Sequence, residues 1–319
     1  DKLIVICLEQ GETDLPPNVR VISLGRERGV NRLGRAINFA RALAVTIGEA
    51  DGVFAHMSPP FAIAAAPFAK ARRLPLVMWY THRSADFKLR LATMLCDAMV
   101  TASPESFQLP TTKVRVLGHG IDPEQFSPLR GEEPGVKGEP PLILAVGRLS
   151  PIKRYELLIE AVKKMRARGI DVRCAIAGGD PLGGKTYGES LRALAGDVVE
   201  FLGIVPHERI TEWYRRSAIT ANLCPTGGLD KAVLEAMFCA RPVVVTNQAF
   251  APLLGAEGAG WLAAEDAEAV AMALVRVLSD PTSQQKADAV RARAVVAHSL
   301  DGLMDRLVQV FKEKVESYV

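Results

Sequence analysis

Short apolar runs alternate with longer segments of mixed polarity along most of the chain. In the first part, apolar runs predict strands and residues with apolar positions at helical spacing predict helices. The predicted strands are residues 3–8, 19–24, 52–55, 75–80, 98–102 and 113–117, and the predicted helices are residues 31–47, 60–72 and 85–95. Helices of ten or more residues between short buried strands are typical of a parallel sheet covered on both faces.

The rhythm breaks at residues 128–141, which are rich in proline and glycine and predict a linker. A second series then begins, with predicted strands at 142–146, 172–177, 199–202, 219–223 and 242–246. Predicted helices cover residues 152–168, 188–195, 208–217 and 230–240, and two or three more lie within 266–315. We therefore predict two doubly wound α/β domains, residues 1–127 and 142–298, and a C-terminal helix at 299–319 that can pack back on the first domain.

Composition narrows the class of protein. The 319 residues are 49% hydrophobic and 24% charged, and no apolar run approaches the roughly 20 residues of a membrane span. The five cysteines are scattered without CxxC spacing, which favours reduced core thiols in a cytoplasmic protein and gives no ligand set for a structural metal. The small net charge of +3 and the 6% aromatic content argue against a nucleic-acid partner.

Positive charge is concentrated near the N-terminus. Residues 1–130 hold 16 Lys and Arg against 12 Asp and Glu, and five arginines lie in and before one predicted helix: Arg26, Arg28, Arg32, Arg35 and Arg41. The other face of that helix is expected to carry its apolar residues, Leu33, Ile37, Ala40 and Leu43. Such a segment can lie on anionic lipid at the inner face of a membrane, although the same pattern also describes a solvated helix face.

Ligands of such sheets bind where strands end, and the loop at residues 145–154 has suitable chemistry. Gly147 ends a strand, Arg148 follows, and Ser150 and Pro151 start a predicted helix with Lys153 in its first turn. Two cations beside a helix N-terminus predict a diphosphate site. The alternative is a pair of solvated surface cations.

A second loop, residues 179–186, satisfies the P-loop pattern with Lys185 in the lysine position. A P-loop enzyme also needs an apolar strand that ends in Asp to hold magnesium, and the strands ending at Cys224 and Thr246 do not supply it. The predicted helix also starts beyond Lys185. We therefore disfavour a P-loop nucleoside triphosphatase.

Residues 224–247 combine a glycine turn with a helix and a strand. Gly227 and Gly228 precede Asp230, a good N-cap, and Glu235 lies about one turn inside the helix. A glycine turn before a helix exposes N–H groups to an anion, and Glu235 can reach a hydroxyl beside it. The alternative is a plain strand-loop-helix unit in which Glu235 faces water.

The histidines divide by position. His82 ends the apolar run LVMWYTH and is the strongest site candidate, followed by His56, which also ends a strand. His119 lies between glycines near the predicted linker. His207 and His298 follow no strand-end pattern and are expected at the surface or at helix ends.

The motifs VGRLSPIKR, IAGGDP, FLGIVP and LDKAVLEAMFCARPVVVT occur in order across about 130 residues and resemble the family-4 retaining glycosyltransferases of the GT-B fold. The segments 79–107 and 118–128 resemble that family's first domain and its approach to the linker. The resemblance implies that Arg148 and Lys153 bind the donor diphosphate, Glu235 the ribose hydroxyls, and His82 the transferred sugar. The remaining positions implied to meet the donor are Gly147, Ile204, Val205, Gly227, Gly228, Leu229, Asp230 and Lys231.

Two departures from the family pattern stand out. The family has a glutamate eight residues before the position of Glu235, where this chain has Gly227. Asp230 or Lys231 is expected to take over its contact with the sugar. The family also opens with a strand, a glycine-rich loop and a helix, whereas this chain begins at what resembles the second strand. We expect an unfilled strand position, completed by upstream sequence or a partner chain.

The sequence therefore predicts a glycosyltransferase that moves a hexose from a UDP- or GDP-sugar to a hydroxyl of a glycan or lipid-linked acceptor. The nucleotide sugar is a substrate, and no cofactor or metal is expected, because cations and a helix N-terminus can neutralise the leaving diphosphate. Two alternatives share the fold: a sugar-nucleotide epimerase, and a degenerate binding subunit without catalysis.

Overall fold

The computed structural model describes residues 2–11, 14–82, 84–128, 138–181, 184, 186–225 and 227–316. The chain forms two compact units. The first comprises Asp1–Thr101, Phe107–Val116 and Leu307–Val319, and the second comprises Ala102–Ser106 and Leu117–Arg306. Most of the predicted linker, residues 129–137, lies outside the described residues.

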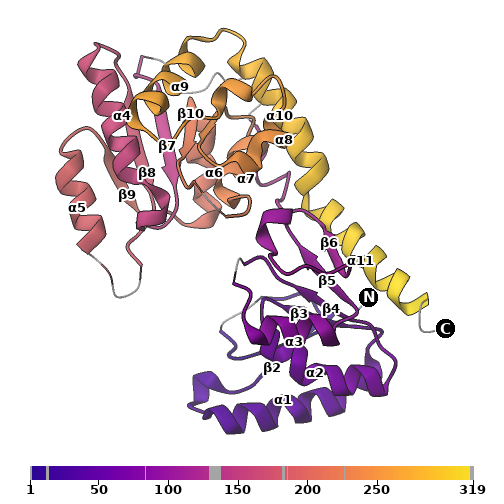
Figure 1. Ribbon diagram of the computed structural model, residues 1–319. Helices are drawn as coiled ribbons and strands as arrows, with labels where there is room; N and C mark the ends of the chain where they lie inside the picture. Colours follow the sequence, from indigo (N-terminus) through magenta and orange to yellow (C-terminus); the bar gives the residue numbers. More distant parts are fainter. Residues whose placement is uncertain are drawn as a thin grey trace. The chain divides into compact units, whose positions relative to one another are not determined.

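The first unit contains two parallel sheets (Figure 1). A two-stranded sheet pairs β1 (Leu3–Cys7) with β2 (Val19–Ser23), and a four-stranded sheet has the order β3-β4-β5-β6. Its strands are β3 (Val53–His56), β4 (Leu76–Trp79), β5 (Ala98–Thr101) and β6 (Val114–Val116). The helices are α1 (Arg32–Thr46), α2 (Pro59–Ala71) and α3 (Phe87–Leu95). Among the described residues β1 and β3 do not pair with each other, so the two sheets remain separate.

The second unit is built on one five-stranded parallel sheet of order β11-β10-β7-β8-β9. Its strands are β7 (Leu142–Val146), β8 (Arg173–Ala177), β9 (Glu200–Gly203), β10 (Ile219–Asn222) and β11 (Val243–Val245). Its helices are α4 (Tyr155–Ala167), α5 (Thr186–Ala195), α6 (His207–Arg216), α7 (Lys231–Phe238), α8 (Ala251–Leu254), α9 (Ala267–Ser279), α10 (Ser283–His298) and the start of α11 (Leu300–Glu316). The order reverses around β7, which places a switch point beside that strand.

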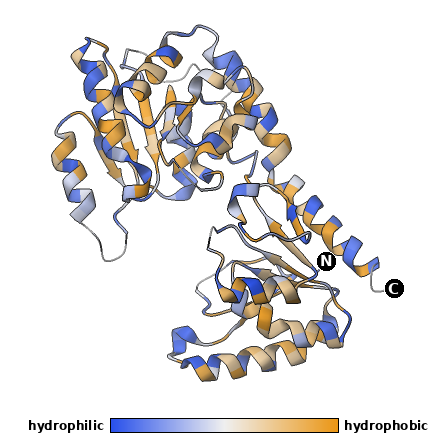
Figure 2. Ribbon diagram, in the orientation of Figure 1, coloured by the Kyte–Doolittle hydropathy of each residue, from blue (hydrophilic) through white to orange (hydrophobic). Residues whose placement is uncertain are grey.

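Apolar residues are concentrated in the strands of the five-stranded sheet (Figure 2). Ile143 and Leu144 of β7, Ala175 and Ile176 of β8 and Val244 of β11 are fully buried. Such strands read as continuous apolar runs because helices cover both faces of a parallel sheet. The α/β class predicted from the pattern is confirmed.

Two local predictions need correction. The predicted apolar face of the first long helix is wrong for Leu33 and Ile37 of α1, which are exposed. Leu43 is buried as predicted, in a stripe with Phe39 and Ala42. The helix predicted from residue 152 begins only at Tyr155 as an α-helix. Residues Pro151–Lys153 form a separate 3-10 turn, and Arg154 between them has φ 52, a left-handed conformation that ends the turn.

The end of the chain contributes to both units. Ser299 pairs with Ile121 in an isolated bridge of the second unit. Within the first unit, the ring of Phe311 on α11 contacts Phe54 of β3 edge to face at 6.3 Å and packs over Gly52. None of the described helices is both long and apolar enough to cross a membrane.

Candidate functional site

A cavity of about 620 Å³ opens in the second unit at the carboxyl ends of β7, β8 and β9. Parallel sheets bind ligands at this edge, because the loops that follow the strands surround the space beyond it. The lining residues are Val146, Gly147, Arg148, Ala177, Gly178, Gly179, Asp180, Pro181, Ile204, Val205, His207, Ile210 and Glu235. Five of the residues predicted for the site, Gly147, Arg148, Ile204, Val205 and Glu235, therefore line one cavity.

The floor of this cavity depends on close backbone approach. Gly178 has φ 159, and a Cβ on it would lie 1.9 Å from the carbonyl oxygen of Gly147, so no larger residue fits. The hydroxyl of Tyr155 donates to the same carbonyl oxygen at 2.7 Å and fixes the loop. Arg148 follows at the cavity wall, exposed, and within the described chain its guanidinium forms no hydrogen bond or ion pair. It is therefore available to an anion.

Lys153 lies beside the same loop, but its charge, unlike that of Arg148, has a partner in the described chain. A Cβ on Gly147 would lie 3.0 Å from Cε of Lys153, so the lysine borders the cavity floor without lining the cavity. Its ammonium group is bound to the carboxylate of Asp230. Lys153 is thus a cation that already has a counter-ion, whereas Arg148 has none in the described chain.

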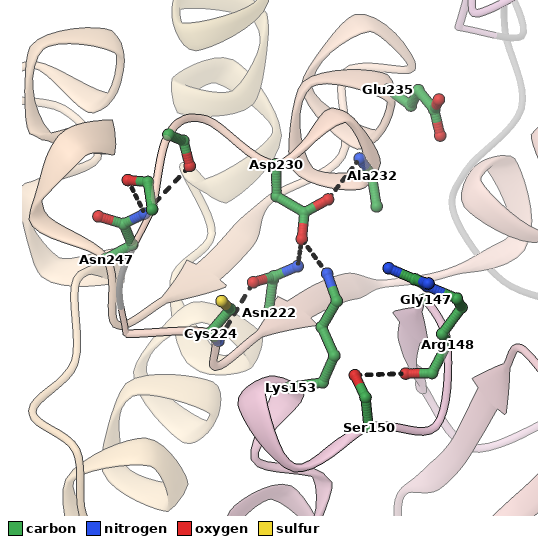
Figure 3. A network of polar contacts seen from close by, with 12 residues as sticks. Gly147, Arg148, Ser150, Lys153, Asn222, Cys224, Asp230, Ala232, Glu235 and Asn247 are labelled. Atoms are coloured by element: carbon green, nitrogen blue, oxygen red, sulfur yellow. Dashed lines mark hydrogen bonds and ion pairs between the residues drawn. The ribbon is translucent and has the colours of Figure 1, made fainter. Parts of the chain in front are cut away.

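Asp230 is the centre of a polar network at the start of α7 (Figure 3). One carboxylate oxygen caps the helix by accepting from the N–H of Ala232, as predicted for an N-cap. The other accepts from Lys153 and, at 2.9 Å, from the side-chain amide of Asn222. The network joins the end of β10, the start of α7 and the turn after β7.

Two asparagines of this region were not predicted. Asn222 ends β10, and Asn247, which follows β11, donates to the carbonyl oxygens of Gly227 and Gly228 at 3.4 and 3.3 Å. A polar residue at the carboxyl end of a buried strand is the signal that could have identified both.

The glycine turn before α7 is fitted to its surroundings. Gly227 has φ 108, which only glycine adopts without strain, and a Cβ on Gly228 would lie 2.0 Å from the hydroxyl oxygen of Ser106. Leu229 is buried, and Lys231 is exposed in the first turn of the helix. The structure thus places Gly227–Lys231 beside the cavity rather than in its lining.

Glu235 occupies an unusual position for a carboxylate. All residues of α7 from Ala232 to Phe238 are buried, and Glu235 is 8% exposed. Tyr214 on α6 donates to its Oε2 at 2.9 Å, and Nε2 of His207 faces its Oε1 at 3.6 Å. Burial raises the pKa of Glu235, and the contacts with Tyr214 and His207 oppose that shift. The interpretation of Glu235 as a solvent-facing residue is therefore wrong.

His207 was expected at the surface or at a helix end, and it begins α6, but it also lines the cavity. His119, in contrast, is buried, and neither ring nitrogen has a hydrogen-bond partner in the described chain. The backbone N–H of His119 donates to Nδ1 of His298 at 3.0 Å. His298 was expected at the surface or at a helix end, and it is a buried residue at the end of α10.

The remaining candidates lie elsewhere. His82 follows β4 in the first unit, where it is exposed and its Nδ1 accepts from the N–H of Ser84 at 3.0 Å. In the P-loop-like segment Leu182, Gly183 and Lys185 lie outside the described residues. The helix that follows it, α5, begins at Thr186, two residues earlier than predicted. No group of three His, Cys, Asp or Glu residues placed to hold a metal occurs in the part of the chain that the structure describes.

Part of the chain matches a known protein family. Residues 140–280 match the family described as "Glycosyl transferases group 1". A GDP-mannose-dependent alpha-(1-6)-phosphatidylinositol monomannoside mannosyltransferase of Mycolicibacterium smegmatis is 29% identical over 191 residues, which is 54% of this chain and 49% of the relative. The chain thus matches about half the length of that relative.

Two solved structures share the fold. HepE of Anabaena in complex with UDP superposes with a TM-score of 0.75 at 17% identity, covering 92% of this chain and 86% of that one. Sucrose-phosphate synthase of Thermosynechococcus elongatus gives 0.73 at 17% identity, covering 99% and 89%. The fold is therefore that of the GT-B glycosyltransferases. The resemblance to glycosyltransferases predicted from the motifs is confirmed over residues 140–280.

Proposed function

We propose that this protein transfers a hexose from a nucleoside-diphosphate sugar to an acceptor hydroxyl with retention of configuration. The observation that carries the proposal is that Arg148, a cation without a partner in the described chain, and Glu235, a buried carboxylate, line one cavity. A nucleoside diphosphate needs a cation to bind its phosphates and a hydrogen-bond acceptor for the hydroxyl groups of its ribose. Arg148 supplies the cation and Glu235 supplies the hydrogen-bond acceptor.

The rest of the donor site follows from the neighbouring loops. The exposed apolar side chain of Ile204, with Val205, gives a surface for the flat base at the end of β9. Lys153 lies beside Gly147 and is bound to Asp230 at the N-terminus of α7. The diphosphate and sugar are proposed to extend toward these two groups. HepE was solved with UDP, and the mycobacterial relative is named for GDP-mannose, which supports a UDP- or GDP-sugar as donor.

The proposed chemistry is front-face substitution. The bond between the anomeric carbon and the diphosphate oxygen breaks, the acceptor oxygen bonds to that carbon on the same face, and the acceptor proton passes to the departing diphosphate. Arg148 and Lys153 stabilise the negative charge that develops on the leaving group. His82 is proposed to contact the transferred sugar, and Asp230 or Lys231 to contact it in place of the glutamate absent at Gly227.

The acceptor is proposed to be a glycan or lipid-linked hydroxyl, reached at a membrane surface by α1. Leu33, Ile37 and Val45 are 72%, 45% and 68% exposed on this helix, which also carries Arg32, Arg35 and Arg41. Apolar side chains among arginines bind an anionic interface through burial and charge together. Polar and apolar residues are interspersed along α1 in Figure 2.

Release of nucleoside diphosphate tests the proposal. The purified protein is incubated with UDP-glucose or GDP-mannose, with and without a panel of inositol phosphates, oligosaccharides and lipid-linked sugars. We expect release that requires an acceptor and is lost in Arg148→Ala. Release of free sugar without an acceptor would favour the epimerase-type reaction, and nucleotide binding without any release would favour a binding subunit.

A further inference from the structure

The hydrogen bonds around His207 identify which of its ring nitrogens carries the proton. Nε2 of the Gln125 side chain lies 3.2 Å from Nδ1 of His207 and 3.4 Å from the His207 backbone carbonyl oxygen. A carbonyl oxygen can only accept, so the amide group that faces it must be the NH₂ end of Gln125. The same NH₂ group therefore donates to Nδ1, which needs a lone pair there and places the ring proton on Nε2.

The proton on Nε2 points to a buried carboxylate. Nε2 lies 3.6 Å from Oε1 of Glu235, and Oε2 of Glu235 accepts from Tyr214 at 2.9 Å. Oε2 thus accepts a hydrogen bond from Tyr214, and Oε1 faces the ring N–H of His207 just beyond hydrogen-bond distance. Because a carboxylate offers about four lone-pair sites, each oxygen keeps one for a ligand.

The supporting side chains are held in place. The Asp122 carboxylate accepts from the N–H groups of Glu124 and Gln125, at 2.8 and 3.3 Å, and fixes the turn that carries Gln125. The ring of Phe126, 2% exposed, stands edge to face against His207 at 5.5 Å and Tyr214 at 6.2 Å. His207 is itself 62% exposed at its side chain, so these contacts, rather than burial, set its orientation.

We propose that His207 is a positioning residue, held by Gln125, whose Nε2–H fixes the Glu235 carboxylate so that it accepts both hydroxyl groups of the nucleotide ribose. The inference rests on the proposed function, because the ribose belongs to the nucleotide donor. Tyr214 holds the second oxygen of the carboxylate, which lines the cavity. The two ribose hydroxyl groups can each donate one charge-assisted hydrogen bond to the Glu235 carboxylate, one to each oxygen.

The test compares nucleotides with and without the two hydroxyl groups. Calorimetric titrations use UDP and GDP and their 2′,3′-dideoxy forms against the wild type, His207→Ala, His207→Gln and Glu235→Gln. We expect His207→Ala to weaken binding of whichever ribonucleotide the wild type binds, UDP or GDP, about tenfold, which corresponds to the loss of one charge-assisted contact. Binding of the dideoxy form of the same nucleotide should weaken less than twofold. His207→Gln, which retains a donor near Nε2, should recover most of the affinity, and the effects of His207→Ala and Glu235→Gln should not add.

The pH dependence of binding gives a second readout. Burial and the Asp230 carboxylate raise the pKa of Glu235, and Tyr214 and His207 lower it, so Glu235 must lose its proton before it accepts both hydroxyls. His207→Ala removes a group that favours the ionised form, and ribonucleotide binding should therefore be lost at a higher pH on acidification than in the wild type. Arg209→Ala, on the same helix but outside the cavity lining, serves as the control with unchanged profile.

The outcomes distinguish the nucleotide site itself from the positioning role of His207. If neither UDP nor GDP binds the wild type, the nucleotide site is refuted and the role of His207 with it. If nucleotide binds and His207→Ala weakens ribo- and dideoxy forms equally, the site stands and the positioning role is refuted. Equal affinity of His207→Gln and His207→Ala would likewise exclude the Nε2 donor.

Discussion

The ammonium group of Lys153 is bound to the Asp230 carboxylate, so one of the two predicted diphosphate cations is neutralised in the structure. Arg148, five residues earlier, forms no such pair within the described chain. A diphosphate would therefore meet one available cation at once and would have to share the second with Asp230. The two cations are expected to contribute differently to donor binding and turnover.

Arg148→Ala is expected to weaken binding of the donor diphosphate and to reduce turnover about 10²-fold, because it removes a cation that stabilises the leaving group. Lys153→Ala should reduce turnover by a similar factor but weaken binding less, since Asp230 already compensates the lysine charge. Initial rates and nucleotide titrations measure both. Lys164→Ala, at an exposed position of α4, is the matched control. Near-normal turnover of Arg148→Ala would show that the diphosphate does not bind at the loop of residues 145–154.

Asp230→Asn separates the cap from the counter-ion. Asparagine is as good an N-cap as aspartate, so the free energy of unfolding should change by less than about 1 kcal/mol. Lys153 loses its counter-ion, and nucleoside diphosphate should bind several-fold more tightly in calorimetry. If Asp230 also contacts the transferred sugar, turnover should fall in the same variant. Weaker diphosphate binding by Asp230→Asn would contradict the competition between Asp230 and the ligand.

Transfer is predicted to be independent of divalent metal. Arg148, Lys153 and the N-terminus of α7 supply the positive charge that a metal provides in other transferases. Activity measured in EDTA should remain near the level in magnesium, and Lys185→Ala should have a mild effect. Loss of donor binding on chelation, restored by magnesium and abolished by Lys185→Ala, would instead favour a P-loop.

His119 and His298 predict a loss of stability in acid. Burial lowers the pKa of each histidine to about 4. The charges of His298 and Lys231 lower the pKa of His119 further, whereas the backbone of Leu229 and the Asp230 carboxylate oppose that shift. The charge of Arg306 lowers the pKa of His298 further. In the unfolded chain they bind protons from about pH 6.5, so stability is complete above that value and falls between pH 6.5 and 4. The loss amounts to at most about 3 kcal/mol for each residue.

His298→Asn tests this because Asn retains an acceptor near the position of Nδ1 for the N–H of His119 but does not titrate. Urea unfolding at pH 7 and pH 4.5, followed by tryptophan fluorescence, should show a smaller pH dependence in this variant than in the wild type. His82→Asn, at an exposed histidine, is the control. An unchanged pH dependence in His298→Asn would show that other groups control the acid sensitivity.

The exposed face of α1 predicts binding to anionic membranes. In sedimentation with vesicles of phosphatidylcholine containing phosphatidylserine, the wild type should bind, and binding should fall as salt rises. The double variant Leu33→Ser with Ile37→Ser should bind vesicles less because it loses apolar insertion. The double variant Arg35→Gln with Arg41→Gln should bind less because it loses the attraction to anionic lipid. Equal sedimentation with neutral and anionic vesicles would contradict the proposed role of the arginines.

The sequence by itself determined the alternation of elements, and most strands and helices begin and end within two residues of their predicted limits. Strand identity followed from continuous apolar runs, because a parallel sheet buries both faces of each strand. That Arg148 and Glu235 lie at the strand-end cavity could also be predicted, since one follows a strand directly and the other lies one turn inside a helix after a glycine turn. Local chemistry was sufficient for these positions.

Only the tertiary structure decided how these residues are used. The full burial of α7 makes Glu235 a buried carboxylate, and that depends on helices distant in sequence rather than on the spacing of its own apolar residues. The pairs Lys153–Asp230, Gln125–His207 and His119–His298 join residues separated by 77, 82 and 179 positions. Contacts between such distant residues arise when parallel strands bring their carboxyl ends to one edge or when the chain returns across its own fold, and no local pattern encodes which side chains then meet.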